Sequence, residues 1–268
     1  MGRRLFYMLI ALCLLVFHTR AIFAEENFLL IDGITNETVL KLGSHVEERI
    51  SPCSTFKITL SLMGYDTGIL IDEVTPSWDF HEGYNDCLPS WRAPITPKSW
   101  LEYSCVWYSK VLSLRLGLEK IQSYLTSMEY GNRDMSGGLA EPGPMDPTWI
   151  NSSLKISPKE QVDFIQKMIL GKLPISTHAI QMTKALLFKE ESPEGWKLFG
   201  KTGWSGSDTG WDGKTLEHGW FVGWLEKDHH FFPFAYLICE QKIDLGERIP
   251  RVKQLLEEAN VMSGAWDN

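Results

Sequence analysis

Hydrophobic and polar residues follow different patterns in successive parts of this chain. Residues 28–33 and 38–43 form two short apolar runs joined by a polar turn, which predicts a strand hairpin. From Ser54 onward, apolar residues occupy nearly every side of a helical wheel, which predicts a helix buried in the core. Gly64 and Gly68 offer places for that helix to end.

The middle of the chain is predicted to be mainly helical. Thr96 followed by proline is typical of a helix start. Helical periodicity then runs through residues 106–116 and 118–128. The clearest helix covers residues 158–170, with a capping box that begins at Ser157.

The last third of the chain changes to strands. Residues 196–203, 219–225 and 231–239 are apolar runs separated by turns, and short connections favour antiparallel pairing. A closing helix is expected at 246–260. The sequence therefore predicts an α+β fold, in which an antiparallel sheet is flanked by terminal helices and a mainly helical subdomain is inserted, roughly at residues 65–190.

Residues 1–24 have the pattern of a signal peptide, with a basic start, an apolar run and Ile22-Phe23-Ala24 before a cleavage point at Glu25. The apolar run is short for a membrane span, although an uncleaved anchor stays an alternative. We therefore expect a single exported domain at residues 25–268 that is periplasmic and has no stable membrane association after cleavage. Removal of the leader would leave 23 basic and 34 acidic side chains.

Composition excludes several classes of protein. The 44% hydrophobic and 22% charged content is that of a globular chain, and the net charge of -8 argues against nucleic acid as a partner. No C-x-x-C or H-E-x-x-H spacing predicts a metal site. Four cysteines follow the leader, and the sequence leaves open three full pairings or none; they are Cys53, Cys87, Cys105 and Cys239.

Ser54 and Lys57 are the first candidates for chemistry. Three residues apart on a helix, their side chains share a face, and the hydroxyl needs a neighbouring base to act as a nucleophile. A lysine serves as that base when burial lowers its pKa or when it is chemically modified. The same S-x-x-K spacing recurs at Ser152 and Lys155, so the spacing alone is weak.

Two further short motifs follow in order. Ser104-x-Val106 places a second hydroxyl at a turn between helices, although S-x-V also occurs at Ser44. Lys201-Thr202-Gly203 ends a predicted strand whose backbone can align a peptide-like group.

The order of these motifs resembles that of the penicillin-recognising serine enzymes, and within them the class D serine β-lactamases, or oxacillinases. The other matching segments are Tyr130-Gly131-Asn132, a stretch from Trp149 to Ser157, Lys201–Gly206 and Trp220–Trp224. The resemblance spans nearly the whole chain after the leader. It implies the β-lactamase/transpeptidase-like fold and hydrolysis of the β-lactam amide through an acyl-serine.

The resemblance also implies roles for particular residues. Ser54 would be the nucleophile, and Lys57 would react with carbon dioxide to form a carbamate that acts as general base. Phe56, Val106 and Trp149 would form the apolar pocket for it. No metal or organic cofactor is implied.

The remaining roles concern the second hydroxyl and the substrate. Ser104 would relay a proton to the leaving nitrogen beside Lys201. Backbone N–H groups of Ser54 and Trp204 would form the oxyanion hole. Substrate contacts would come from Thr202, Gly203 and Arg248, with Arg251 as the alternative to Arg248.

Some features depart from the family pattern. Residues 141–147 make the segment before Trp149 longer than in the shortest members, and Cys53 and Cys105 are interpreted as packing residues. Trp100, Trp107 and Trp204 are further candidates for the cleft. A D,D-peptidase or penicillin-binding protein and a non-hydrolytic β-lactam sensor stay as alternatives. The sequence does not predict the substrate range, the oligomeric state or the extent of lysine carboxylation.

Overall fold

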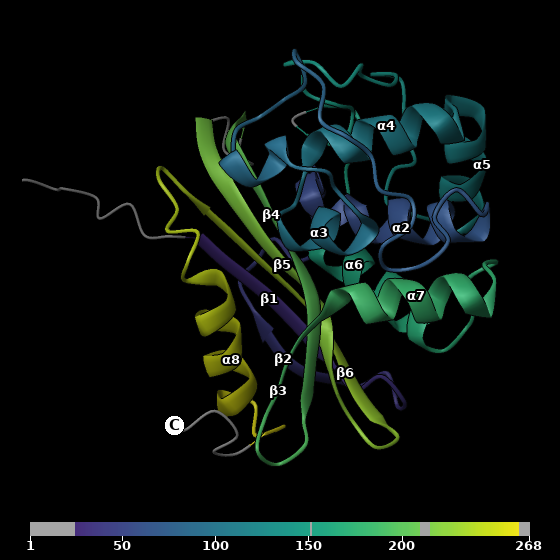
Figure 1. Cartoon of the computed structure of the whole chain (residues 1–268). Helices are drawn as coiled ribbons and strands as arrows, with labels where there is room; N and C mark the ends of the chain where they lie inside the picture. The colour runs from purple at the N-terminus through teal and green to yellow at the C-terminus, as the bar shows by residue number, and fades with distance from the viewer. Residues whose placement is uncertain (1–24, 151, 210–214, 263–268) are drawn as a thin grey trace, which may run out of the picture.

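The computed structural model describes residues 25–150, 152–209 and 215–262, so the predicted leader lies outside the described residues (Figure 1). Its sheet is antiparallel throughout, with strand order β2-β1-β6-β5-β4-β3. The strands are β1 (Glu25–Ile31), β2 (Thr38–Leu42), β3 (Phe188–Glu191), β4 (Lys197–Thr209), β5 (Thr215–Lys227) and β6 (His230–Glu240).

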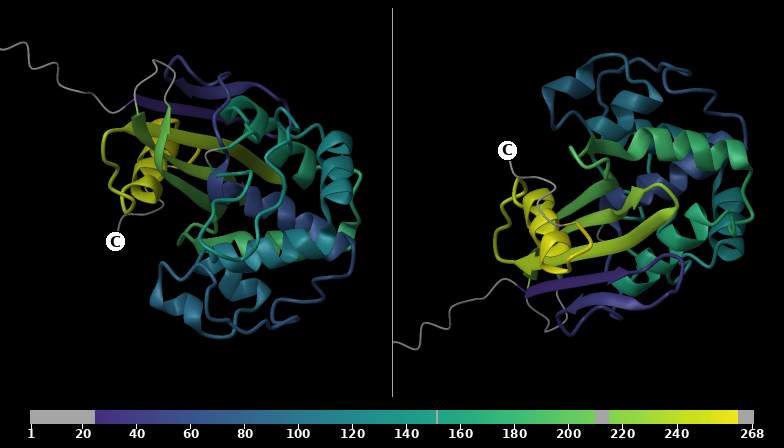
Figure 2. Two further views of the ribbon diagram at one scale, coloured as in Figure 1. Left: turned by 90° about the horizontal axis from the view of Figure 1, so that it is seen from above. Right: turned by 90° about the horizontal axis from the view of Figure 1, so that it is seen from below.

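Helices cover both faces of this sheet. The helix α8 packs on one face, and the others gather on the opposite face (Figures 1 and 2). The helices are α2 (Phe56–Asp66), α3 (Pro97–Glu102), α4 (Val106–Leu116), α5 (Leu118–Ser127), α6 (Pro158–Ile169), α7 (Thr177–Leu187) and α8 (Arg248–Glu258), with short 3-10 turns η1 (Cys53–Thr55) and η2 (Pro89–Arg92). None of the helices in the described ranges combines the length and the apolar character that a membrane crossing requires.

The α+β fold class and the main predicted elements are confirmed. The capping box at Ser157 is present, and Gly117 separates α4 from α5. Of the expected terminal helices only α8 falls among the described residues, because the described chain begins in β1. The sequence patterns did not single out α7 or the short, half-exposed β3.

The sheet is buried on both faces because its strands alternate between two apolar layers. On β1, Phe28 and Leu30 pack toward α8, whereas Leu29 and Ile31 pack toward the helical layer. On the helical side, α6 contacts β1, β5 and β6 while α7 contacts β4, and α2 packs in turn against α7 and α4.

The turn that leads into α2 carries a strained residue. Cys53, fully buried, has φ of +50°, in the left-handed region that disfavours a side chain with Cβ. Its N–H donates to the carbonyl of Trp149. The carbonyl of Ser51, two residues earlier, accepts from the Trp220 indole at 2.9 Å and lies 3.1 Å from His218 Nε2. These contacts hold the backbone in a conformation that it would otherwise leave.

We expect the cost of this strain to be visible in a matched pair of variants. Cys53→Ala and Cys53→Gly both lose the thiol, but only glycine relieves the left-handed backbone. The glycine variant should be the more stable of the two by about 1 kcal/mol, measured by urea unfolding. Equal stability, or a more stable alanine variant, would mean that the turn stores no strain.

Candidate active site

One cavity of about 430 Å³ lies where the sheet meets the helical layer. Its sheet bank consists of residues from β4, α8 and the segment before α8: Thr202, Gly203, Trp204, Ser205, Gly206, Leu245 and Arg248. Its helical bank consists of residues from the helical side: Asn85, Cys87, Leu88, Trp91, Tyr103, Ser104, Val106, Asp146 and Ile150. Ser54, from η1, also lines the cavity.

Ser54 and Lys57 meet as their spacing predicts. Nζ of Lys57 lies 2.9 Å from Oγ of Ser54, and the lysine side chain is fully buried. Burial lowers the pKa of Lys57 to about 8, an effect that the nearby thiols of Cys105 and Cys53 oppose. A substantial fraction of this amine is therefore neutral near physiological pH, so it can accept a proton or attack an electrophile.

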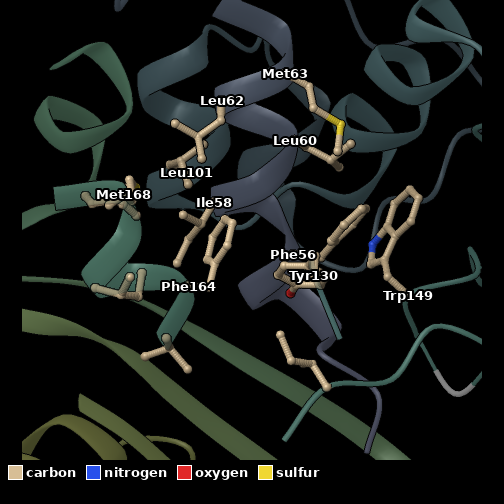
Figure 3. Close-up of a cluster of buried hydrophobic side chains, with 14 of the residues drawn as sticks. Phe56, Ile58, Leu60, Leu62, Met63, Leu101, Tyr130, Trp149, Phe164 and Met168 are labelled. Carbon is tan, nitrogen blue, oxygen red and sulfur yellow. The ribbon is translucent and has the colours of Figure 1, made fainter. Parts of the chain in front are cut away.

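Aromatic side chains surround the start of α2. The ring of Phe56 packs against Trp149 at 5.2 Å and against Tyr130 at 5.6 Å between centroids (Figure 3). Val106, partly buried at the start of α4, lines the cavity. The indole Nε1 of Trp149 is buried, lies on the side of the ring that faces α2, and has no hydrogen-bond partner among the described residues (Figure 3). A buried donor of this kind calls for an acceptor.

Ser104 and Lys201 form a second pair. Ser104 lies in the turn between α3 and α4, and Lys201 lies on β4. Nζ of Lys201 lies 2.9 Å from Oγ of Ser104 and 3.0 Å from the carbonyl of Thr202. Ser104 has φ of +56° between α3 and α4, which turns its hydroxyl toward the cavity. Burial holds the pKa of Lys201 well below its ordinary value, and the charges of Lys57 and other cations add to the shift.

Gly203 lets β4 approach the turn that carries Ser54. A Cβ built on Gly203 would lie 3.1 Å from the carbonyl of Pro52 and 3.2 Å from Thr55 Cγ2. Next to it, Trp204 directs an indole that is 43% exposed along the cavity, and its Nε1 donates to Glu217 at 3.3 Å. The absence of a side chain at Gly203 thus allows β4 to contact the η1 turn that carries Ser54.

Arg248, and not Arg251, reaches the cavity. Its guanidinium donates to the carbonyls of Gly203 at 2.6 Å and Leu245 at 3.0 Å, and its stem crosses β5 at Gly219, where a Cβ would come within 3.1 Å. Burial lowers the pKa of Arg248 to about 10. Arg251 instead forms an ion pair with Glu26 on β1.

The Tyr130-Gly131-Asn132 motif lies outside the cavity lining and braces the segment that follows Trp149. Gly131 has φ of +51°, and a Cβ there would collide with the carbonyl of Lys155 at 2.2 Å. Asn132 exchanges hydrogen bonds with the backbone of Lys155 and donates from its side chain to the carbonyl of Ser153. These bonds give the motif a structural role, in keeping with its prediction as a structural motif.

The structure places the remaining candidates as follows. Trp100 and Trp107 are fully buried and lie outside the cavity, contrary to expectation, while Trp204 lines it. Cys53 and Cys105 are packed in the core, as interpreted. Across the described part of the chain, no group of His, Cys, Asp or Glu side chains has the arrangement of a metal site.

Sequence reasoning missed several residues of the helical bank. Asn85, Leu88 and Asp146 belong to irregular segments whose polarity is typical of any surface loop, so no local signal marks them. Ile150 could have been identified, because it lies inside the Trp149–Ser157 segment that carries the family resemblance.

Comparisons with known proteins identify the family of this chain. The family model of the penicillin binding protein transpeptidase domain matches residues 30–257. The chain is 36% identical to β-lactamase OXA-9 of Klebsiella pneumoniae over 88% of its own length and 87% of the relative's. It is 36% identical to β-lactamase OXA-1 of Escherichia coli, covering 79% of this chain and 75% of that one.

Among solved structures, the class D β-lactamase OXA-427 matches with a TM-score of 0.77 and 36% identity. The match covers 87% of this chain and 97% of that one. The family model, the two relatives and the solved structure each cover most of the described chain, including the segments that carry Ser54, Ser104 and Lys201. This chain belongs to the class D β-lactamases, within the penicillin-binding transpeptidase family.

Proposed function

We propose that this protein hydrolyses the β-lactam amide bond of penicillin-type antibiotics through an acyl intermediate on Ser54. The observation that carries the proposal is the convergence of two hydroxyl–amine pairs on one cavity, Ser54 with Lys57 and Ser104 with Lys201. One pair can activate a nucleophile and the other can deliver a proton to the leaving group, which together are the requirements for acyl transfer.

Ser54 would attack the carbonyl carbon of the lactam while its proton passes to a base at Lys57. The attack produces a negative charge on the carbonyl oxygen, and the backbone N–H groups of Ser54 and Trp204 are the donors proposed to stabilise it. Each such donor contributes about 3 kcal/mol to the stability of the transition state. The close packing of β4 on η1 at Gly203 supports this assignment, because it brings the two backbone segments to the same side of the cavity.

The residues around Lys57 fit a carbamate. The buried indole N–H of Trp149, for which the described residues supply no acceptor, is suited to donate to a carbamate oxygen. The lowered pKa of Lys57 provides the neutral amine with which carbon dioxide reacts. When present, the carbamate would supply the general base for acylation and for hydrolysis of the acyl-serine.

Ser104 and Lys201 are the proposed route for the second proton. As the C–N bond of the lactam breaks, the nitrogen takes the hydroxyl proton of Ser104. Lys201, 2.9 Å from that hydroxyl, returns a proton to it. The strongly lowered pKa of Lys201 supports this step, because a weakly held ammonium proton is transferred readily.

Arg248 and Thr202 are the proposed contacts of the substrate carboxylate. Arg248 already uses two of its N–H groups on backbone carbonyls, which fixes the plane of the guanidinium at the sheet bank. A carboxylate bound there would favour the protonated form of Lys201, because burial and the neighbouring charges of Lys57 and Arg248 are what lower the pKa of this amine. A penicillin bound in this way would project its acyl side chain toward the helical bank.

Turnover by the purified residues 25–268 tests the function directly. We expect many turnovers of nitrocefin per molecule, and a loss of about 1,000-fold or more in Ser54→Ala and Lys57→Ala because each removes a group that reacts. Ser104→Ala should lose about 100-fold or more through slower protonation of the nitrogen. The assay is absorbance of the opened product.

The second Ser-x-x-Lys sequence of the chain offers a matched control. Ser152→Ala and Lys155→Ala should keep nitrocefin turnover within about twofold, since neither residue lines the cavity. A single stoichiometric burst that leaves Ser54 stably acylated, detected by mass spectrometry, would instead identify a penicillin-binding protein or a sensor.

Lysine carboxylation gives a separate prediction with a defined dependence on pH. Formation of the carbamate consumes a neutral amine and releases a proton, and the Lys57 pKa is about 8. At a fixed concentration of dissolved carbon dioxide, the apparent affinity of Lys57 for carbon dioxide should rise with pH. The rise should be about 100-fold per pH unit below pH 8 and about tenfold per unit above it. Carbon-13 NMR with labelled bicarbonate measures the carbamate, with Lys57→Ala as control.

The steep lower limb of this pH dependence reflects loss of two protons, one from the ammonium and one from the nascent carbamic acid. If the logarithm of the apparent affinity for carbon dioxide rises with pH at a constant slope through pH 8, Lys57 does not titrate there. A signal that survives in Lys57→Ala would place the carbamate on another amine.

We also propose that residues 1–24 are removed on export to the periplasm. A chain that begins at Glu25 keeps all of β1. Glu25 is the first residue of that strand, pairs with Cys239 of β6, and has its carboxylate 2.5 Å from Nε2 of His45. Intact mass of the periplasmic protein should therefore correspond to residues 25–268. A mass that includes residues 1–24 would favour the uncleaved anchor.

A further inference from the structure

A lysine that the proposed chemistry does not use is buried behind the helical bank. Lys110 lies on α4, one turn beyond Val106, and its side chain is fully buried. Its Nζ donates to the carbonyl of Gly143 at 2.7 Å and also to the carbonyl of Met145. A lysine is rarely buried completely unless specific partners compensate its charge, so these contacts need an explanation.

The carbonyls that hold Lys110 belong to a segment that borders the cavity. Asp146 lines it directly, whereas Met145 beside it is 76% exposed to solvent. The segment 143–146 falls within residues 141–147, the stretch that the family resemblance predicts to be longer here than in the shortest members. Lys110 thus reaches from the helix that carries the Ser104 motif to the backbone of this longer segment.

A second segment of the helical bank is tied to the first. The N–H of Asn85 donates to the carbonyl of Pro142 at 2.9 Å, and Asn85, Cys87 and Leu88 all line the cavity. The two segments therefore form one wall, the outer wall, made of residues 85–88 and 142–146. Among the described contacts of this wall, the Lys110 ammonium supplies two hydrogen bonds from the protein interior.

We propose that Lys110 is a positioning residue that holds the outer wall against the cavity and thereby sets the affinity for substrates with large acyl side chains. The inference rests on the proposed function, because it needs Arg248 to orient the substrate with its acyl group toward the helical bank. Lys110 itself touches neither the substrate nor the reacting atoms.

The charge of the ammonium suits this role. Its donors are aimed at two carbonyls, which are favourable acceptors for a cation, and the carboxylate of Asp146 attracts it further. Desolvation lowers the pKa of Lys110, which is the expected sign for an ammonium held inside the fold. Without this amine the two carbonyls would lose their donor and turn toward water, which draws the outer wall away from the cavity.

The chemistry should survive loss of Lys110 because Trp149 has anchors of its own. Its carbonyl accepts from Cys53, its ring packs on Phe56, and the preceding Thr148 hydroxyl donates to Gly138. A change in the outer wall therefore alters binding of the acyl group more than the reaction at Ser54.

The test compares Lys110→Met, which keeps the apolar stem and removes the donors, with Lys98→Met as a control on neighbouring α3. Lys98 is 64% exposed and paired with Glu73. In Lys110→Met, the KM for oxacillin should rise about tenfold, while the KM for 6-aminopenicillanic acid, which lacks an acyl side chain, stays within about twofold. The kcat for both should stay within about threefold, and Lys98→Met should match the wild type.

Hydrogen exchange supplies a readout that does not depend on turnover. Peptides covering residues 83–88 and 142–147 should exchange at least about tenfold faster in Lys110→Met than in wild type, whereas peptides of α2 should not change. Should Lys110→Met fail to fold, Lys110→Gln, which retains a shorter donor, is expected to show smaller changes in the same direction.

Three outcomes would overturn the proposal: equal changes in KM for the two substrates, unchanged KM for both, or unchanged exchange in the outer wall. Failure of the proposed function would give a different result from failure of this proposal. In that case wild type turns over neither substrate, and the exchange experiment still decides whether Lys110 holds the outer wall.

Discussion

Burial of the Lys57 amine is the constraint on which the site depends. An ammonium in an apolar surround is costly, and its pKa falls accordingly, here to about 8. The fold maintains this surround by burying α2 from Phe56 to Tyr65 and by packing the ring of Phe56, the residue before the lysine, against Trp149. A helix with an ordinary solvent-facing stripe would leave the amine hydrated and its pKa near that of a free lysine. The same burial leaves the Trp149 indole without an acceptor among the described residues.

A second requirement is close approach of the sheet to that helix. Gly203 allows β4 to reach the turn of Ser54, and Gly219 allows the Arg248 stem to cross β5. The result is a concentration of cations, with Lys201 close enough to Lys57 and Arg248 for their charges to lower its pKa. In a chain whose net charge is -8, this cluster of basic groups favours an anionic substrate, because a bound anion would relieve the repulsion that lowers the pKa of Lys201. Strain at Cys53 is tolerated because neighbouring strands and Trp149 hold its backbone.

Much of this arrangement follows from local patterns. The apolar run after Ser54, the capping box at Ser157 and the alternation in β1 depend on neighbours in the sequence, so they were predictable. The order of the short motifs along the chain then indicated which of them belong to one site. It favoured Ser54-x-x-Lys57 over the second S-x-x-K sequence at Ser152. Where a segment lacks such periodicity, as in β3, its local sequence does not distinguish a strand from a loop.

The sequence by itself determined the class of fold, the motif residues and the need for a buried lysine. Only the tertiary structure decided which arginine reaches the cavity: Arg248 and Arg251 are three residues apart, yet one crosses Gly219 and the other pairs with Glu26. It also decided that Lys110 contacts a segment more than 30 residues away. Such contacts arise from the packing of distant segments, and the free energy that selects them is absent from any local stretch of sequence.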